Sequence, residues 1–191
     1  MPSANFKEKA IDLFSLLDDE GIDWVLVGAE AMNLYVKRPR ATVDVDIVVR
    51  KKDLRRVRKV LERVCVDLKE TEVHWHGVLS KPPMLLELDV IKSTSHELFE
   101  TALDRKVLMG GVQVVPVECL LALKYLAAVS ALRSREDKGR DILDFMVTFR
   151  DNKKRLNRRL LIDLASRAHQ NAREEFLAFL DAVENKKPIT L

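Results

Sequence analysis

The stretch VLVGAEAMNLYVKRPRATVDVDIVV, residues 25–49, decides how the rest of the chain is organised. It begins with an apolar run, breaks at Gly28, continues with a helical pattern and ends in a second apolar run that carries Asp44 and Asp46. Two carboxylates at positions i and i+2 of a strand project from the same face, roughly 6.6 Å apart along it. Burying two uncompensated carboxylates side by side is costly. The pair therefore predicts a cation, the mouth of a cleft, or both.

The composition is that of a globular protein without membrane association. The chain has 191 residues, of which 47% are hydrophobic and 33% charged, enough for one domain or for one domain with a helical appendage. No apolar run approaches the ~20 residues that a membrane span needs, and the N-terminal residues do not follow the pattern of a secretory signal. Cys65 and Cys119 are too few for a disulfide framework. We therefore expect a cytoplasmic location. The net charge of +3 is too small to demand nucleic acid.

Hydrophobic periodicity predicts an α+β fold with a helical subdomain at its end. Strands are expected over residues 23–27, 43–49, 64–69, 72–79 and 85–91. Helices are expected over residues 4–20, 29–37, 52–64 and 95–105, the last with Ser95 as its N-cap. A turn is expected at Pro82–Pro83, and a hairpin at Gly110–Gly111 within residues 106–117. Four further helices are expected over residues 116–132, 136–150, 155–169 and 172–184.

These elements predict a mixed sheet with flanking helices in residues 1–115 and a helical subdomain in residues 116–191, packed on that core. Pro116 suits the first position of a helix. No flexible linker separates the two parts, so the predicted boundary is soft and the chain could also form a single domain.

A third carboxylate is expected near the first two. The segment LLELDVI, residues 85–91, places Glu87 and Asp89 on one face of a strand. If this strand lies beside the strand of Asp44 and Asp46, three acidic groups converge. Carboxylate oxygens are the ligands that Mg²⁺ prefers, and two such ions can hold the attacking and leaving oxygens of a phosphoryl transfer. In the alternative interpretation, Asp44 and Asp46 are strand-end carboxylates paired with Arg40 or Arg50.

Gly28 lies between a buried strand and a predicted helix. The first turn of a helix presents free N–H groups and a partial positive charge, which suit an anionic phosphate. A single glycine at such a turn is usually only a turn. One helix before the acidic strand, however, it would bring a phosphate close to a metal site.

Together these motifs resemble the DNA polymerase β-like nucleotidyltransferase superfamily, in particular its small prokaryotic members from abortive-infection and toxin–antitoxin systems. The pattern of those members is Gly, a small residue, any residue and Ala, followed by Arg-x-Thr-x-Asp-x-Asp. The chain has GAEA at residues 28–31 and RATVDVD at residues 40–46. The later segments LELDVI, LLALKYLAA and RSREDKGRDILDF fit as well, so the resemblance covers residues 23–150.

The resemblance implies a Mg²⁺- or Mn²⁺-dependent nucleotidyltransferase fold and activity. It implies metal binding and catalysis by three residues, Asp44, Asp46 and Asp89. It implies nucleotide binding by Gly28, Ala29, Arg40, Lys124, Lys138 and Asp141. The implied reaction transfers a nucleoside monophosphate from a nucleoside triphosphate (NTP) to an RNA 3′ end or a protein hydroxyl. The implied partners are the NTP, tRNA or other RNA, and a cognate toxin or antitoxin.

Ala29 departs from the family pattern, because many relatives carry Ser or a second Gly there. A serine hydroxyl would contact the triphosphate, whereas Ala29 offers only its backbone N–H. The alternative function is therefore a catalytically inactive module of the same fold that binds or regulates a partner. Asp-x-Asp is also typical of metal-dependent glycosyltransferases, for which the chain is short.

Two lysines of the predicted helical subdomain allow more than one interpretation. Lys124 lies in an apolar run, which predicts a functional or ion-paired role. Lys138 lies four residues before Ile142 on an apolar stripe and would snorkel or point into a cleft. The alternative for this helix is pairing along a solvated face, such as Arg140 with Asp144. Arg40 and Thr42 could equally brace the acidic strand.

Two further features carry weaker predictions. His74 and His76 could share a strand face and bind a metal, but no third ligand is apparent, so exposed histidines are the simpler interpretation. The basic helix over residues 51–63 could follow an RNA backbone, as could a second basic cluster at residues 150–159. Such runs are more often solvated faces.

Overall fold

The computed structural model describes residues 4–81 and 84–189, and it divides the chain into two compact units. The sheet unit comprises the residues up to Leu34 together with Arg38–Pro116. The helical unit comprises Tyr35–Lys37 together with the residues from Val117 onward. The turn predicted at Pro82–Pro83 lies outside the described residues.

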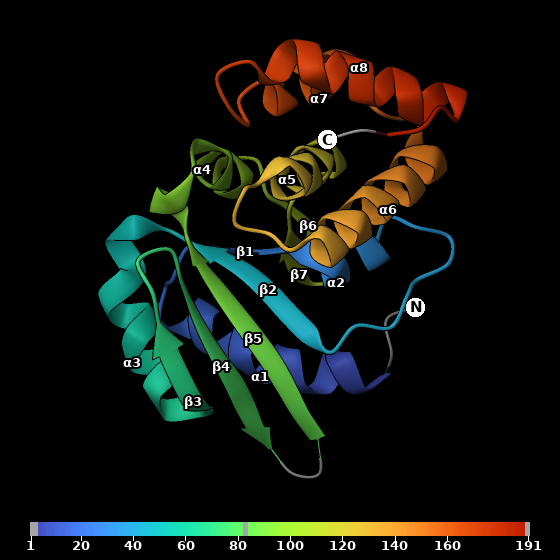
Figure 1. The fold of residues 1–191 in the computed structure, drawn as a ribbon. Helices are drawn as coiled ribbons and strands as arrows, with labels where there is room; N and C mark the ends of the chain where they lie inside the picture. Colours follow the sequence, from blue (N-terminus) through green and yellow to red (C-terminus); the bar gives the residue numbers. More distant parts are fainter. Residues whose placement is uncertain (1–3, 82–83, 190–191) are drawn as a thin grey trace. The chain divides into compact units, whose positions relative to one another are not determined.

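The sheet unit is built on a seven-stranded sheet in the order β3-β4-β5-β2-β1-β7-β6 (Figure 1). The strands are β1 (Trp24–Val27), β2 (Asp44–Val49), β3 (Cys65–Glu70), β4 (His74–Lys81), β5 (Met84–Lys92), β6 (Val107–Met109) and β7 (Val112–Val114). β2 runs parallel to β5, and β1 runs parallel to β7, while the other neighbours are antiparallel. The predicted mixed sheet is confirmed.

The helices of this unit are α1 (Ala4–Asp19), α2 (Gly28–Asn33), α3 (Leu54–Val64) and α4 (Glu97–Asp104), with short 3₁₀ turns η1 (Lys51–Asp53) and η2 (Ser93–Ser95). Helix α1 passes behind β2 and β5 in the view of Figure 1, and α1 contacts α3. Apolar side chains from both helices and from one face of the sheet are buried, among them Leu17, Val57, Leu61, Ile47, Val90 and Trp75. Burial of this face fixes the register of the strands, because a shift by one residue would expose it.

In the sheet unit the end predicted for α2 and the N-cap predicted for α4 were wrong, and side-chain hydrogen bonds explain both differences. Helix α2 ends at Asn33 and not at residue 37, since the Asn33 amide binds the backbone of Arg40 through both its nitrogen (2.9 Å) and its oxygen (3.0 Å). Helix α4 is capped by His96, whose Nδ1 accepts a hydrogen bond from the Leu98 N–H at 3.1 Å. The Ser95 hydroxyl instead donates to the Lys92 carbonyl.

The predicted glycine hairpin is confirmed between β6 and β7. Gly110 and Gly111 have φ angles of 58° and 86°. A two-residue turn with positive φ at both positions is the type that matches the twist of a hairpin, and glycine adopts it without strain.

The helical unit contains the four predicted helices, α5 (Val117–Val129), α6 (Arg135–Asn152), α7 (Arg158–Ala165) and α8 (Ala172–Asn185). Helix α5 ends before the predicted residue 132, and α6 starts where the Ser134 hydroxyl accepts a hydrogen bond from the Asp137 N–H. The segment Tyr35–Lys37 is tied to the end of α6: the Asn152 amide donates to the Tyr35 carbonyl at 3.0 Å. The Lys37 N–H donates to Asp151 at 2.9 Å.

An aromatic cluster forms the centre of the helical unit. Tyr125 packs edge-on against Phe176, and Phe145 packs edge-on against Phe179, each pair with ring centroids 4.8 Å apart. The Tyr125 side chain is fully buried, and burial, followed by the charge of Glu175, raises the pKa of its phenol to about 12. Its hydroxyl has no hydrogen-bond partner within the described part of the chain. No helix in that part is long and apolar enough to cross a bilayer.

We expect Tyr125→Phe to leave the stability of the protein unchanged or to raise it by up to about 1 kcal/mol, because a buried hydroxyl without a partner costs free energy. Tyr125→Ala, the size control, should lower stability by about 3–5 kcal/mol, as for other large aromatic truncations in cores. Urea denaturation followed by circular dichroism measures both. A clear loss of stability in Tyr125→Phe would show that the hydroxyl has a partner after all.

Candidate active site

Three residues of the sheet form a continuous row, which we call the acidic row: Asp46 on β2, Asp89 on β5 and His76 on β4. Asp46 pairs with Asp89 in the parallel register of β2 and β5, and Asp89 pairs with His76 in the antiparallel register of β5 and β4. Neighbouring strands lie about 4.8 Å apart, and directly paired residues share a face. The sequence expectation that the two acidic strands are neighbours is confirmed. Two residues before Asp46 on β2, Asp44 pairs with Glu87 of β5.

Gly28 stands directly against the acidic row. Val27, the last residue of β1, pairs with Asp46, so the next residue begins the turn into α2 beside that carboxylate. Gly28 has a φ of 67°, and a Cβ atom added to it would lie 1.9 Å from the Asp46 Oδ2. Both the backbone angle and the space therefore require glycine. The turn predicted to hold a phosphate thus touches a carboxylate predicted to hold a metal.

Asp44 is held by a residue of the loop that precedes its strand. The Thr42 hydroxyl donates a hydrogen bond to the Asp44 Oδ1, so Thr42 braces the acidic strand as one of the two interpretations expected. The predicted alternative pairing with Arg50 is wrong. Arg50 instead binds three other carboxylates at 2.6–2.8 Å: Asp23, Glu100 and Asp104. Arg40 has its backbone fixed by Asn33.

Glu30 adds a buried carboxyl that the sequence interpretation missed. It lies on α2, two residues after Gly28, and is buried. Burial raises the pKa of Glu30, while a hydrogen bond with Asn33 opposes this rise and the nearby charge of Asp44 adds to it. Helical periodicity could not reveal it, because α2 is buried nearly all round and so shows no polar face.

The sequence suggests His76 only as a metal ligand together with His74, whereas in the structure His76 is hydrogen-bonded to a carboxylate. Its Nδ1 lies 2.9 Å from the Asp89 Oδ1. His74, on the same face of β4, has its Nδ1 3.0 Å from the Thr71 hydroxyl. The two imidazoles thus face different partners. Across residues 4–81 and 84–189, no three or more His, Cys, Asp and Glu side chains stand close enough to hold a metal ion as they are oriented.

The acidic row nevertheless fits a hard divalent cation by its chemistry. Asp44, Asp46 and Asp89 supply only carboxylate oxygens, which Mg²⁺ and Mn²⁺ accept as ligands. Asp44 accepts a hydrogen bond from the Thr42 hydroxyl, and Asp89 is hydrogen-bonded to His76. These hydrogen bonds, together with repulsion between the like charges, explain why the oxygens are not gathered around one point.

The helical unit holds the other residues predicted to bind the nucleotide. Lys124 is 12% exposed, and its Nζ lies 2.9 Å from Asp141 and 2.8 Å from Asp144. Burial alone would lower the pKa of Lys124, but the two carboxylates outweigh it and raise that pKa. Lys124 is therefore ion-paired, one of its two expected roles. The alternative of i,i+4 pairing along a solvated face holds for Arg140, which pairs with Glu136. The partner given as its example, Asp144, instead pairs with Lys124.

Lys138 is half-buried on α6, and among the described residues its side chain makes no ion pair. Its contact with nucleotide phosphates stays a prediction, as do those of Gly28, Ala29, Arg40, Lys124 and Asp141. The sheet unit brings together Gly28, Asp44, Asp46 and Asp89. The helical unit brings together Lys124 and Asp141.

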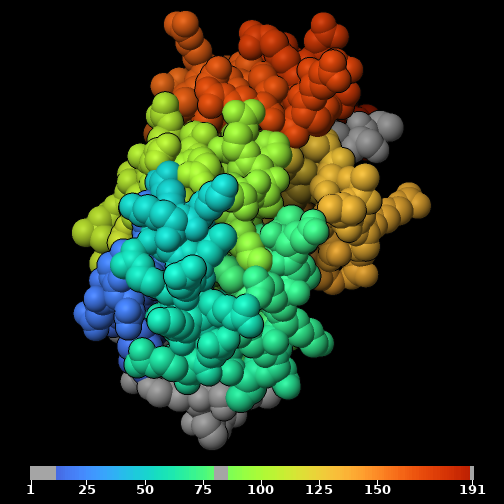
Figure 2. All heavy atoms as spheres, turned by 90° about the vertical axis from the view of Figure 1, so that its left-hand side faces the viewer, coloured from blue at the N-terminus to red at the C-terminus, as the bar shows by residue number. Residues whose placement is uncertain are grey.

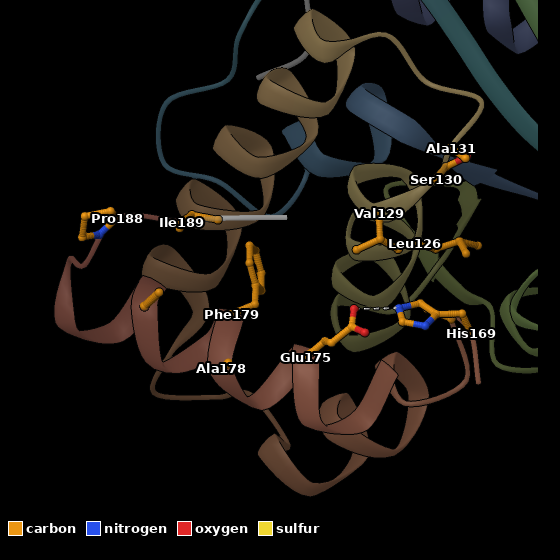
Figure 3. Close-up of a pocket in the computed structure, with 12 residues that line it drawn as sticks. Leu126, Val129, Ser130, Ala131, His169, Glu175, Ala178, Phe179, Pro188 and Ile189 are labelled. Carbon is orange, nitrogen blue, oxygen red and sulfur yellow. Dashed lines mark ion pairs between the residues drawn. The ribbon is translucent and has the colours of Figure 1, made fainter. Parts of the chain in front are cut away.

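The helical unit also has an open pocket of about 750 Å³, shown in Figure 3. Its lining is mainly apolar and includes Leu126, Val129, Ala178, Phe179, Ala182 and Ile189. His169 and Glu175 form an ion pair across it at 3.4 Å. A single carboxylate in an apolar lining suits neither a triphosphate nor a hard metal ion. This pocket is therefore not the candidate active site.

The basic helix predicted over residues 51–63 is α3 with the turn before it, shown in cyan in Figure 2. Three of its arginines are paired with carboxylates: Arg56 with Asp53, Arg58 with Glu62 and Glu70, and Arg63 with Glu20. Four cations make no ion pair within the described residues: Lys51, Lys52, Arg55 and Lys59. Contact with RNA stays a prediction for this face.

We expect Gly28→Ala to destabilise the protein by several kcal/mol, because the new Cβ meets Asp46 and the backbone must hold a positive φ. Gly139→Ala in α6 is the matched control. Its Cβ would meet nothing within 4 Å, and alanine in a helix should add about 0.5–1 kcal/mol of stability. Thermal denaturation of both variants tests the contact. Equal stabilities for the two variants would show that the Gly28 turn does not touch Asp46.

We expect Lys124→Met to lower the stability of the protein by about 3–5 kcal/mol, because it leaves two buried carboxylates without their cation. Replacing both carboxylates as well, in Lys124→Met/Asp141→Asn/Asp144→Asn, should recover part of the loss. Urea denaturation measures stability, and NTP titration measures binding. A Lys124→Met variant that keeps its stability but loses NTP affinity would instead assign the lysine to the nucleotide.

Comparison with known proteins agrees with the resemblance found in the sequence. Residues 12–76, about a third of the chain, match the family described as "Nucleotidyl transferase AbiEii toxin, Type IV TA system". The matched segment contains Gly28, Asp44 and Asp46 and ends at His76. None of the curated proteins matches the chain.

Several solved structures match the chain in fold, among them these three. JHP933 from Helicobacter pylori is 18% identical with a TM-score of 0.55, covering 95% of this chain and 78% of that one. A chain from the same organism, described as a nucleotidyltransferase, gives the same identity and TM-score and is covered to 81%. ANT(2″)-Ia in complex with adenylyl-2″-tobramycin is 11% identical with a TM-score of 0.62, covering 87% of this chain and 100% of that one.

At these identities the structural comparisons establish the fold alone. The fold class and the enzyme class predicted from the sequence agree with the matched family and with these structures. Residues 12–76 are thus similar to the AbiEii nucleotidyltransferase family, and the chain has the fold of these solved structures, which agrees with the resemblance stated from the sequence.

Proposed function

We propose that this protein transfers a nucleoside monophosphate from an NTP to a hydroxyl group, with the acidic row as its catalytic centre. The observation that carries the proposal is the contact of the Gly28 turn with Asp46, next to Asp89 on the neighbouring strand. A phosphate-binding turn and a pair of metal-binding carboxylates are what this reaction needs within a few ångströms of each other.

Each residue of the site has a distinct task in the proposed reaction. Asp44, Asp46 and Asp89 would hold the divalent cation, and Asp89 would also accept the proton of the attacking hydroxyl. When bound, Mg²⁺ or Mn²⁺ offsets the negative charge that develops on the phosphoryl oxygens. The N–H groups of Gly28 and Ala29 bind phosphate oxygens. Arg40 supplies positive charge within the sheet unit. Lys124, Lys138 and Asp141 belong to the helical unit, and their contact with the nucleotide stays a prediction.

The bond changes are those of an in-line substitution at phosphorus. The acceptor oxygen attacks the α-phosphorus and forms a new P–O bond, while the bond from the α-phosphorus to the oxygen bridging to the β-phosphate breaks. Pyrophosphate leaves with the electron pair of that bond, and the hydroxyl proton passes to Asp89. In this scheme the protein supplies position and charge compensation, and no covalent intermediate forms on the chain.

We propose an RNA 3′ end, such as that of tRNA, or a protein hydroxyl as the acceptor, in a toxin–antitoxin or abortive-infection setting. The matched family is described as a toxin of a type IV system, which supports a cognate antitoxin as partner. Lys51, Lys52, Arg55 and Lys59, which make no ion pair with any residue that the structure describes, would favour a polyanionic acceptor.

A catalytically inactive module is the second candidate, and Ala29 favours it. Its methyl side chain is buried and offers no hydroxyl to the triphosphate. Against this candidate stand the three carboxylates and Gly28. A site that no longer binds a cation would gain stability by losing like charges held side by side.

We expect label transfer from an NTP labelled at the α-phosphate to total tRNA or to a candidate partner protein, dependent on Mg²⁺ or Mn²⁺. Asp44→Asn/Asp46→Asn should abolish transfer, a loss of at least about 10³-fold, because the cation loses two ligands. The matched control is Asp19→Asn/Asp67→Asn, which changes the same net charge at exposed positions of the sheet unit. Thermal denaturation confirms that each variant is folded.

Two results would contradict the proposal. Transfer that persists in Asp44→Asn/Asp46→Asn would remove the catalytic role of the acidic strand. No transfer by the wild-type protein, together with no transfer by Ala29→Ser, would favour the inactive module. Transfer by Ala29→Ser alone would show that the missing hydroxyl is what limits the natural chain. A tobramycin arm tests whether the acceptor resembles that of ANT(2″)-Ia.

A further inference from the structure

His76 is the one member of the acidic row that the proposed reaction leaves without a task. We propose that His76 is a positioning residue for Asp89: its Nδ1 donates a hydrogen bond to Oδ1 and so directs Oδ2 of the same carboxylate to the cation. This inference rests on the proposed function, since it concerns the same site. It assigns a role to a residue on β4, a strand that contributes none of the predicted site residues.

The arrangement of the row supports this role. Asp89 is flanked on one side by Asp46 and on the other by His76, each in direct register. The imidazole therefore reaches Asp89 from the side away from the second carboxylate. β5 and β4 are interior strands of the sheet, with β2 and β3 outside them, so the two backbones are fixed relative to each other. The 2.9 Å contact is thus set by the sheet and not by a loop.

The contact answers a physical difficulty of the site. Two like charges on adjacent strands repel, and a free aspartate would rotate its carboxylate away from its neighbour. A hydrogen bond at one oxygen restricts that rotation and leaves the second oxygen available. In metal sites such outer hydrogen bonds orient the ligands, and their removal typically lowers metal affinity by about 10–100-fold.

The contact between His76 and Asp89 is only partly buried, so this hydrogen bond can orient Asp89 without being essential to the fold. The side chains of His76 and Asp89 are 38% and 33% exposed, so both are reached by solvent. Neither belongs to the buried core of the sheet unit. Loss of the imidazole should therefore change the orientation of Asp89 more than it changes global stability.

His74 provides a matched control on the same strand. It lies on the same face of β4, two residues away, and it also uses its Nδ1 for a hydrogen bond. Its partner is the hydroxyl of Thr71, outside the acidic row. A substitution there removes an imidazole of similar surroundings without touching Asp89.

The test compares four single variants of the full chain and one double variant, His76→Leu/Asp89→Asn. His76→Leu removes the donor, whereas His76→Asn keeps one, because the amide nitrogen of asparagine occupies the place of Nδ1. His74→Leu is the control, and Asp89→Asn removes the acceptor charge. The first readout is Mn²⁺ binding without nucleotide, followed by electron paramagnetic resonance of the free ion. The second is kcat and KM for the NTP, and thermal denaturation reports folding.

We expect His76→Leu to weaken Mn²⁺ binding by about 10–100-fold and to lower kcat, with KM for the NTP changed much less. His76→Asn should restore Mn²⁺ affinity to within about 3-fold of the wild type, and His74→Leu should leave it unchanged. In the Asp89→Asn background, His76→Leu should have no further effect, because the two residues act through one contact. A readout without metal is nitrogen-15 NMR of the imidazole, which should show a proton on Nδ1 that responds to Asp89→Asn.

The inference fails if His76→Leu binds Mn²⁺ as the wild type does, or if His76→Asn is as defective as His76→Leu while both remain folded. If His76→Leu unfolds, the comparison of His76→Asn with the wild type decides. These outcomes are separable from failure of the proposed function. That failure would appear as transfer, or Mn²⁺ binding, that survives Asp44→Asn/Asp46→Asn.

Discussion

The site depends on one constraint: the sheet holds two carboxylates, Asp46 and Asp89, in direct register on adjacent parallel strands. Two like charges held this close repel each other, and the surrounding residues offset part of that repulsion. The glycine turn brings backbone within contact of Asp46, and His76 binds Asp89 from the other side. The strands can carry this pair because their opposite face is buried in the apolar core, which fixes the register.

The two units solve the problem of buried charge in different ways. In the helical unit, Lys124 pairs with Asp141 and Asp144, and Arg133 lies 3.8 Å from Asp141. These ion pairs offset part of the cost of burying the charges. In the sheet unit Asp44, Asp46 and Asp89 are half-exposed, and Asp44 accepts a hydrogen bond from the neutral Thr42 hydroxyl. These carboxylates are the ones that an added cation can reach from solvent. This contrast favours the sheet unit as the place of the chemistry.

The sequence predicted the features that short-range rules govern. The alternation of β2, the Gly110–Gly111 hairpin and the four late helices follow from periodicity and turn chemistry. The end of α2 was missed because Asn33 binds Arg40 across a loop, a contact that no local pattern encodes. The partner of His76 was missed for a related reason. It depends on which strand lies beside β4, and strand order is a property of the whole sheet.

The segment Tyr35–Lys37 has a practical consequence for dissecting this protein. It follows the glycine turn in sequence and precedes the acidic strand, yet it belongs to the helical unit, where α6 binds its backbone. The chain therefore crosses between the two units more than once, and no single cut separates them. A fragment ending near Pro116 would carry three residues stripped of their hydrogen-bond partners. A fragment starting near Pro116 would lack Tyr35–Lys37, the segment whose backbone is hydrogen-bonded to the end of α6. Limited proteolysis at that junction should consequently yield two pieces that stay associated until denaturant is added.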